Sequence, residues 1–305
     1  MKYNIIPSIV LLIMIFFSCG TPPKQIKSAY STEKFTGTII PGQWLTGISV
    51  QYIVNNIPKE CPLQIYFPKN YNNGTPARTL IALHNYEGSL TSWGKKTNIE
   101  HYANKYGFIL VCPEMGRTIY ETKYYPETTR RWNGIPGGKW VGDILLPYLQ
   151  QKFSIALKKE KTGILGYSTG ARGAFIIASN YPQYFSAVAG LSGDYDPISM
   201  PKDRLLTSVY GTYKNFPERW SNDDNIIKQA IHLKNTYTFI AHGEKDGMVP
   251  CDQSRLLTIR LLQLMNKDKS YYKPEFYIKV KKFHNWEFWR MMVPPMMEFF
   301  DRSLK

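Results

Sequence analysis

Cysteine is scarce in this sequence, with four residues among 305. One of them, Cys19, lies in the N-terminal segment. The other three, Cys61, Cys112 and Cys251, are an odd number and allow at most one disulfide. The motifs C-x-x-C and H-E-x-x-H are both absent. A disulfide framework is therefore not indicated, and a zinc site built from protein ligands has no support.

Acidic residues are few relative to basic ones. The 23 Asp and Glu residues against 38 Lys and Arg residues leave a formal net charge of +15. Such an excess can indicate nucleic-acid binding. Here, however, the lysines are scattered along the chain and gather only in short runs such as Lys158-Lys159 and Lys281-Lys282. We interpret the charge as a solvated basic surface and expect no nucleic-acid partner.

The N-terminal apolar run, from Ile5 to Phe17, is shorter than the roughly 20 residues of a membrane-spanning helix. It follows one lysine and is typical of a cleaved export signal. Its end, Phe-Phe-Ser-Cys, resembles the lipobox of bacterial lipoproteins, with Phe16 where Leu is usual. Residues 1–18 are thus predicted to be a lipoprotein signal peptide and Cys19 the lipidation site, which implies a lipid anchor in the bacterial cell envelope, periplasmic or at the cell surface. A plain signal peptide cleaved near Cys19 is the alternative.

The segment after Cys19 has few apolar residues. Residues 20–35 contain Pro22, Pro23 and three lysines, which is typical of a flexible tether, and we place this tether at 19–35. Beyond it, no repeat, low-complexity run or obvious linker divides the chain. A chain that is 43% hydrophobic and 14% aromatic can bury a large core. We therefore predict a single domain over 36–305.

From about residue 79, short apolar runs alternate with longer helical patterns, as in a parallel sheet covered by helices. Runs that are apolar throughout suit central strands, because both faces of such strands are covered. The predicted parallel strands are 79–83, 108–112, 163–165, 187–191, 237–241 and 276–280. The predicted helices are 97–105, 140–153, 169–180, 224–233, 254–265 and 286–300, and an antiparallel pair, 48–54 and 63–67, precedes the core. The predicted fold class is α/β, a mostly parallel sheet with helices on both faces.

The stretch Gly166-Tyr-Ser-Thr-Gly170 is a G-x-S-x-G motif between a predicted strand and a predicted helix. A strand that turns abruptly into a helix forms a nucleophile elbow, which exposes the central serine at the carboxyl edge of the sheet. The two glycines leave room for the helix and strand to approach. Ser168 is therefore the candidate nucleophile, near the positive end of a helix dipole. The alternative is an N-cap serine before a Gly-rich turn.

A serine hydroxyl needs a base and an orienting acid to act as a nucleophile. In this context the chain order is Ser, then Asp or Glu, then His. A carboxylate in a loop after a strand is where the acid is expected, and Asp246, after the predicted strand 237–241, is our choice. Glu244 in the same loop is the local alternative, and Asp194 or Asp196 after the preceding strand are the remote ones.

Of the five histidines, only two lie downstream of Ser168 in loops that follow strands. His284 precedes the last predicted helix, where a loop can place an imidazole over the nucleophile, and we predict it as the base. His242 shares its loop with the predicted acid, and we interpret it as a structural turn residue. The full set is His84, His101, His232, His242 and His284.

An oxyanion hole needs backbone N–H groups directed at the developing negative oxygen. One is expected from Thr169, the residue after the nucleophile, and another from the loop 84–88 that follows the predicted strand 79–83. The long segment 116–139 would overhang the same edge of the sheet. In it, Trp132 suits stacking on a sugar or phenolic ring and Arg131 can pair with a carboxylate or phosphate, so both are candidate substrate-binding residues. A packed cover for the core is the alternative.

The runs ALHNYEG, GYSTG, AHGEKDGMVP and FHNWEFW together resemble the esterase D-like group of α/β-hydrolases. This group includes feruloyl and acetylxylan esterases and polyhydroxybutyrate-depolymerase-like enzymes. The resemblance spans roughly residues 60–300 and implies the α/β-hydrolase fold. Family members usually have His-Gly where this chain has His84-Asn85. By this resemblance the triad is Ser168, Asp246 and His284, and the oxyanion hole is formed by the amides of Tyr86 and Thr169.

These features predict a serine hydrolase that cleaves carboxylic esters through an acyl-enzyme, with acyl groups on carbohydrates as the expected substrates. No metal or organic cofactor is needed. The expected partners are the ester substrate and the membrane that holds the lipid anchor. An acyltransferase or a peptidase that uses the same triad is an alternative, and so is a lipoprotein that only binds a ligand.

Overall fold

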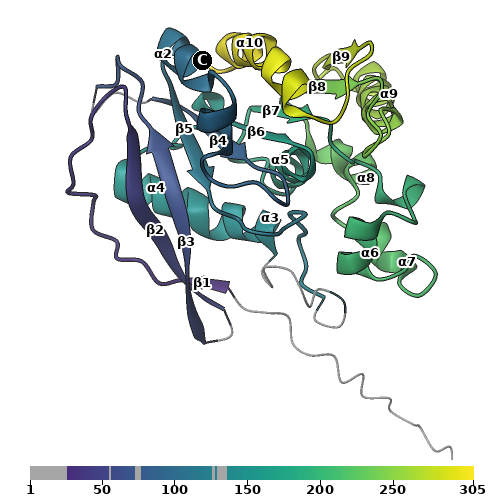
Figure 1. The fold of residues 1–305 in the computed structure, drawn as a ribbon, viewed down its shortest axis with the longest axis horizontal. Helices are drawn as coiled ribbons and strands as arrows, with labels where there is room; N and C mark the ends of the chain where they lie inside the picture. The colour runs from purple at the N-terminus through teal and green to yellow at the C-terminus, as the bar shows by residue number, and fades with distance from the viewer. Residues whose placement is uncertain (1–25, 55, 73–76, 126–127, 129–135) are drawn as a thin grey trace, which may run out of the picture.

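The computed structural model describes residues 26–54, 56–72, 77–125, 128 and 136–305. One nine-stranded sheet runs through its centre (Figure 1). The strands are β1 Ile26–Ser28, β2 Trp44–Val54, β3 Ile57–Tyr66, β4 Arg78–Leu83, β5 Phe108–Pro113, β6 Thr162–Tyr167, β7 Ala187–Leu191, β8 Tyr237–Gly243 and β9 Glu275–Lys279. Their order across the sheet is β1-β2-β3-β5-β4-β6-β7-β8-β9.

The sheet is antiparallel at one edge and parallel elsewhere. β1, β2, β3 and β5 pair antiparallel in succession, whereas β5, β4, β6, β7, β8 and β9 pair parallel. Every residue of β5, β6 and β7 is buried, as expected for parallel strands that are covered on both faces. The carboxyl ends of parallel strands meet at one edge, so the loops that follow these strands converge there.

Helices cover both faces of the sheet (Figure 1). One face is covered by α3 Gly137–Trp140, α4 Leu146–Phe153, α5 Thr169–Asn180, α8 Ile226–Gln229 and α9 Asp252–Lys267. The other is covered by α1 Ser92–Lys96, α2 Ile99–Tyr106 and α10 Trp286–Ser303. A π-helical turn, Val141–Leu145, joins α3 to α4.

Two further helices, α6 Arg204–Tyr210 and α7 Pro217–Trp220, lie outside these two layers. They form a separate small core in which Leu206 and Trp220 pack with Ile119 of the loop after β5. The sequence did not predict them. Helices of seven and four residues carry almost no periodic signal, and such short helices form only when tertiary packing stabilises them.

The predicted α/β architecture is confirmed, with small differences at the ends of elements. The predicted helix 169–180 coincides with α5 and the predicted strand 187–191 with β7. β6 extends through Tyr167, two residues beyond the predicted strand. The predicted helix 224–233 is shorter in the structure, where α8 is followed by the 3₁₀ turn Ala230–His232.

The C-terminal part of the predicted tether packs on the domain. The rings of Tyr30 and Tyr148 lie 4.9 Å apart, as do those of Phe35 and Phe153, and β1 pairs with β2. Aromatic side chains bury a large apolar area in such contacts, which hold Tyr30 and Phe35 against α4. This part of 19–35 is therefore folded and not a free tether. The predicted signal peptide and Cys19 lie outside the described residues.

Among the residues that the structure describes, no helix combines the length and the apolar character needed to cross a membrane. The described part likewise contains no group of three or more His, Cys, Asp or Glu side chains placed to hold a metal ion. Cys61, Cys112 and Cys251 are all free thiols. Burial raises the pKa of the Cys61 and Cys112 thiols to about 12, so both are protonated at neutral pH.

Candidate active site

Ser168 stands at the sharp turn between β6 and α5 in a strained backbone conformation, with φ 55° and ψ −128°. A hydrogen bond from its backbone N to the Leu191 carbonyl, 2.8 Å long, holds the turn against the end of β7. A Cβ at Gly166 would lie 2.1 Å from the carbonyl oxygen of Gly170, and one at Gly170 would lie 2.5 Å from that of His84. Both glycines of the motif are therefore required by close backbone approach.

The structure brings together the three predicted side chains. His284 Nε2 lies 2.8 Å from Ser168 Oγ, and His284 Nδ1 lies 2.7 Å from Asp246 Oδ2. His284 comes from the loop between β9 and α10, and Asp246 from the loop after β8. The side chain of Asn285 caps α10 by accepting from the backbone N of Phe288, so the helix begins at Trp286, two residues after the histidine. These contacts form a continuous hydrogen-bonded chain from the serine to the acid.

The Asp246 carboxylate is fully occupied by donors. Its Oδ1 accepts from the backbone N–H groups of Met248, at 3.0 Å, and Val249, at 2.8 Å. Its Oδ2 faces His284 and also His242, whose Nε2 lies 3.1 Å away. Burial alone would raise the pKa of this carboxyl, but the hydrogen bonds from the two histidines, the His284 charge and the Val249 amide together lower it. Asp246 is therefore an ionised carboxylate.

His242 has a larger part in this site than its interpretation as a turn residue implied. It is fully buried, with Nε2 3.0 Å from the Val249 carbonyl and Nδ1 2.7 Å from Ser254 Oγ. Because a carbonyl only accepts, Nε2 carries the proton, and Nδ1 accepts from the Ser254 hydroxyl. His242 therefore donates to the same oxygen of Asp246 as His284 does. The H-x-x-x-D spacing, from His242 at the end of β8 to Asp246 in the loop after it, is the signal that could have indicated this contact.

The alternative acids point elsewhere. Glu244 is exposed and accepts from the backbone N of Lys281 at 3.2 Å. Asp194 is paired with Arg172, at 3.3 Å. Asp196 accepts from the side-chain amide of Asn225, at 2.8 Å. Of the four acids considered, Asp246 is the one hydrogen-bonded to His284.

The backbone around the predicted oxyanion hole is held by buried contacts. Thr169 is the first residue of α5, so its N–H has no acceptor within the helix. The loop that carries Tyr86 is fixed by His84, whose Nε2 accepts from the Met115 backbone N at 2.9 Å and whose Nδ1 therefore donates to the Asn85 carbonyl at 2.6 Å. Burial lowers the pKa of His84, so this ring is neutral. The oxyanion role of Tyr86 and Thr169 stays a prediction.

A cleft of about 720 Å³ opens in front of Ser168. Its wall combines apolar side chains from several elements with a few charged ones. The residues that line it are Asn85, Tyr86, Glu87, Ile119, Ser168, Thr169, Asp194, Met200, Lys202, Asp203, Arg204, Leu205, Leu206, Met248, Val249, His284 and Trp289. The predicted substrate-binding residues Trp132 and Arg131 lie outside the described residues. A cleft of this size suits a small ligand.

Comparison with known proteins relates the sequence to esterases. A family model described as "Putative esterase" matches residues 54–300. The chain is 22% identical to an acetyl esterase of Caldicellulosiruptor saccharolyticus over 74% of this chain and 84% of that protein. It is 26% identical to feruloyl esterase B of Neurospora crassa over 66% of this chain and 70% of that protein. It is also 23% identical to acetylxylan esterase A of Emericella nidulans, over 62% of each.

The fold is shared with solved serine hydrolases. The fluorophosphonate-binding serine hydrolase F of Staphylococcus aureus superposes with a TM-score of 0.65 at 20% identity, covering 86% of this chain and 99% of that one. At this identity the likeness shows the fold alone, which is that of the α/β-hydrolases. The family model spans most of the chain. The chain therefore belongs to the esterase family and is a serine esterase that hydrolyses carboxylic esters.

Proposed function

We propose that Ser168, His284 and Asp246 are the catalytic triad of this esterase and that its substrates are acyl esters of carbohydrates. The observation that carries the triad is the unbroken chain of hydrogen bonds, 2.8 Å from Ser168 to His284 and 2.7 Å from His284 to Asp246. It lies at the cleft wall, at the edge where the parallel strands end. Nucleophile, base and orienting acid thus stand in series, each within hydrogen-bond reach of the next.

In the first half-reaction, His284 Nε2 takes the proton of Ser168 as Oγ attacks the ester carbonyl. The carbonyl oxygen becomes an oxyanion, and the amides of Tyr86 and Thr169 are proposed to receive it. His284 then gives the proton to the departing alcohol, and an acyl-enzyme remains. In the second half-reaction, His284 activates a water that releases the acid. Asp246 holds the imidazole with its proton on Nδ1 throughout.

The carbohydrate part of the proposal is supported by the names of the relatives, which include an acetylxylan esterase and a feruloyl esterase. The side chains of the cleft wall are consistent with a carbohydrate ester. Apolar side chains such as Met248 and Leu205 suit an acyl group, and polar ones such as Asn85 suit a hydroxylated alcohol. Transfer of the acyl group to a second sugar would use the same triad, and no feature of the described site favours it over hydrolysis.

The purified protein is expected to release free acetate from acetylated xylo-oligosaccharides, because water completes the second half-reaction. Proton NMR of the mixture measures acetate and any newly acylated sugar together. Acylated sugar as the main product would instead identify a transferase. Cleavage of 4-nitrophenyl acetate without any action on sugar acetates would show that the carbohydrate assignment is wrong while leaving the esterase intact.

We also propose that the protein is held in the bacterial cell envelope by a lipid on Cys19. The support is the sequence alone, a short apolar run followed by Ser-Cys. Cys19→Ala is expected to abolish incorporation of a palmitate analogue during growth, since the cysteine is the acceptor. Lys27→Ala, a substitution in β1, is a matched control and should leave labelling unchanged. Equal labelling of the Cys19→Ala variant would contradict the anchor.

A further inference from the structure

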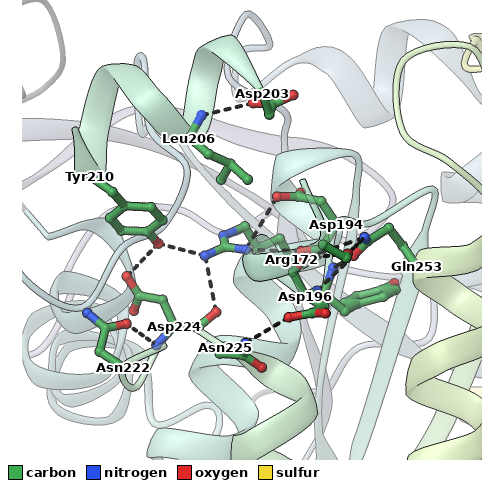
Figure 2. Close-up of polar contacts among 12 residues, drawn as sticks. Arg172, Asp194, Asp196, Asp203, Leu206, Tyr210, Asn222, Asp224, Asn225 and Gln253 are labelled. Carbon is green, nitrogen blue, oxygen red and sulfur yellow. Dashed lines mark hydrogen bonds and ion pairs between the residues drawn. The ribbon is translucent and has the colours of Figure 1, made fainter. Parts of the chain in front are cut away.

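A buried guanidinium lies one helical turn after the nucleophile. Arg172 on α5 is completely buried, and Figure 2 shows it at the centre of a polar network. Its Nη1 donates to the backbone carbonyl and the carboxylate of Asp194, at 3.1 and 3.3 Å. Its Nη2 donates to the Tyr210 hydroxyl at 2.6 Å and the Asp224 carbonyl at 3.1 Å. The network therefore ties the helix of Ser168 to α6 and to the loop before α8.

Asp194 differs from the other members of this network because it also lines the cleft. It follows β7, beside the turn that carries Ser168, and only 5% of its surface is exposed. Burial raises the pKa of its carboxyl to about 6, while the adjacent Arg172 pulls the pKa down. The Arg172 guanidinium, which donates to this carboxyl at 3.3 Å, favours its ionised form in the wall of the cleft.

This arrangement is costly for a purely structural pair. Desolvating two charges costs free energy that their attraction returns only in part, and well-packed apolar residues of similar volume often serve stability as well or better. Here Arg172 engages one oxygen, Asp194 Oδ2, and Asp194 belongs to the cleft wall although its side chain is only 7% exposed. A buried acceptor beside the nucleophile suits a donor on the substrate.

The charges around the cleft indicate which kind of hydrogen-bond donor the substrate carries. Three acids, Glu87, Asp194 and Asp203, face two cations, Lys202 and Arg204, so the described wall has no strong excess of either sign. Asp203 is further occupied as the cap of α6, where it accepts from the backbone N of Leu206. A mixed wall of this kind favours neither an anionic nor a cationic substrate. An uncharged hydroxyl group fits it, because a hydroxyl can donate to a carboxylate without a counter-charge.

We propose that Asp194, held by Arg172, is a substrate-binding residue that accepts a hydrogen bond from a free hydroxyl on the alcohol part of the ester. This inference rests on the proposed carbohydrate-ester function and narrows it to esters with an unsubstituted hydroxyl near the scissile bond. Arg172 is a positioning residue in this scheme, since it touches Asp194 and not the substrate. No bond is made or broken at Asp194.

The test compares two esters that differ only at their hydroxyls, methyl 2-O-acetyl-β-xyloside and its 3,4-di-O-methyl derivative. The ratio of their kcat/KM values cancels any change in the triad. The wild-type enzyme is expected to have a kcat/KM about tenfold or more higher for the free-hydroxyl ester, which is the usual contribution of one charge-assisted hydrogen bond. Asp194→Leu should bring the ratio close to one, and Asp194→Asn should give an intermediate value because it keeps an acceptor.

Asp194→Leu removes the ion-pair partner of the buried Arg172 guanidinium and leaves it only uncharged acceptors, the Tyr210 hydroxyl and the backbone carbonyls of residues 194 and 224, which can prevent folding. The double variant Arg172→Met with Asp194→Leu removes both charges and replaces the single variant in that case. Tyr210→Phe is the matched control, because it loses the hydrogen bond from Arg172 and the one to Asp224 without altering the cleft wall, and it should keep the wild-type ratio.

Three results would overturn the proposal. A wild-type ratio near one with both sugar esters cleaved would contradict the Asp194 contact and leave the carbohydrate-esterase function standing. An unchanged ratio in Asp194→Leu or the double variant would show that the network is structural only. Failure to cleave either sugar ester, with 4-nitrophenyl acetate still hydrolysed, would contradict the proposed substrate class itself and the inference with it.

Discussion

Ser168→Ala is expected to lower kcat for ester hydrolysis by about 10⁴-fold or more, because the variant has no nucleophile to form the acyl-enzyme. The loss should be close to complete whatever the ester, since both half-reactions pass through Ser168 Oγ. The backbone strain at φ 55° is held by the glycines and by the bond to Leu191, neither of which the substitution alters. The folded structure should therefore survive, and circular dichroism can verify this.

A fluorophosphonate probe gives a second measurement of the same prediction. It should label one residue of the wild-type protein, Ser168, and tandem mass spectrometry of the labelled peptide identifies the site. Ser49→Ala removes a serine on β2, far from the cleft, and should change neither labelling nor turnover. Labelling of another serine, or hydrolysis that persists in Ser168→Ala, would remove Ser168 from the mechanism.

Asp246→Asn is expected to lower kcat by about 10⁴-fold while the fold is kept. If the amide nitrogen takes the place of Oδ2, it donates to His284 Nδ1, and the imidazole proton moves to Nε2, where it faces Ser168. The same nitrogen would also meet the Nε2–H of His242, now 3.1 Å from Oδ2. Turning the amide over places its nitrogen against the N–H groups of Met248 and Val249 instead. In both orientations, therefore, the amide N–H of the asparagine faces another N–H donor.

Glu244→Gln is the matched control, because Glu244 lies in the same loop but is exposed and bonded to the backbone of Lys281. It should change kcat less than about threefold, in line with an exposed carboxylate remote from the reacting atoms. Steady-state kinetics with 4-nitrophenyl acetate compare the two variants. A larger loss in Glu244→Gln than in Asp246→Asn would reverse the assignment of the acid.

Local sequence patterns determined the parallel sheet and the turn that carries Ser168. The apolar runs of β5, β6 and β7 are visible without any tertiary information, because strands covered on both faces admit almost no polar side chain. The elbow is equally local, since Gly166 and Gly170 are required by backbone atoms within the turn and in the adjacent loop. The order of serine, acid and histidine along the chain then restricted the partners of Ser168 to a few residues.

Only the tertiary structure decided which of those residues meet. Four acids satisfied the sequence criteria, and the choice among them depends on hydrogen bonds of 2.7 to 3.3 Å between residues 22 to 38 positions apart in the chain. The helices α6 and α7 and the approach of Asp194 to both Arg172 and the cleft share this origin. Local periodicity carries no information about them, because such contacts form only when the completed sheet brings the carboxyl ends of its strands to one edge.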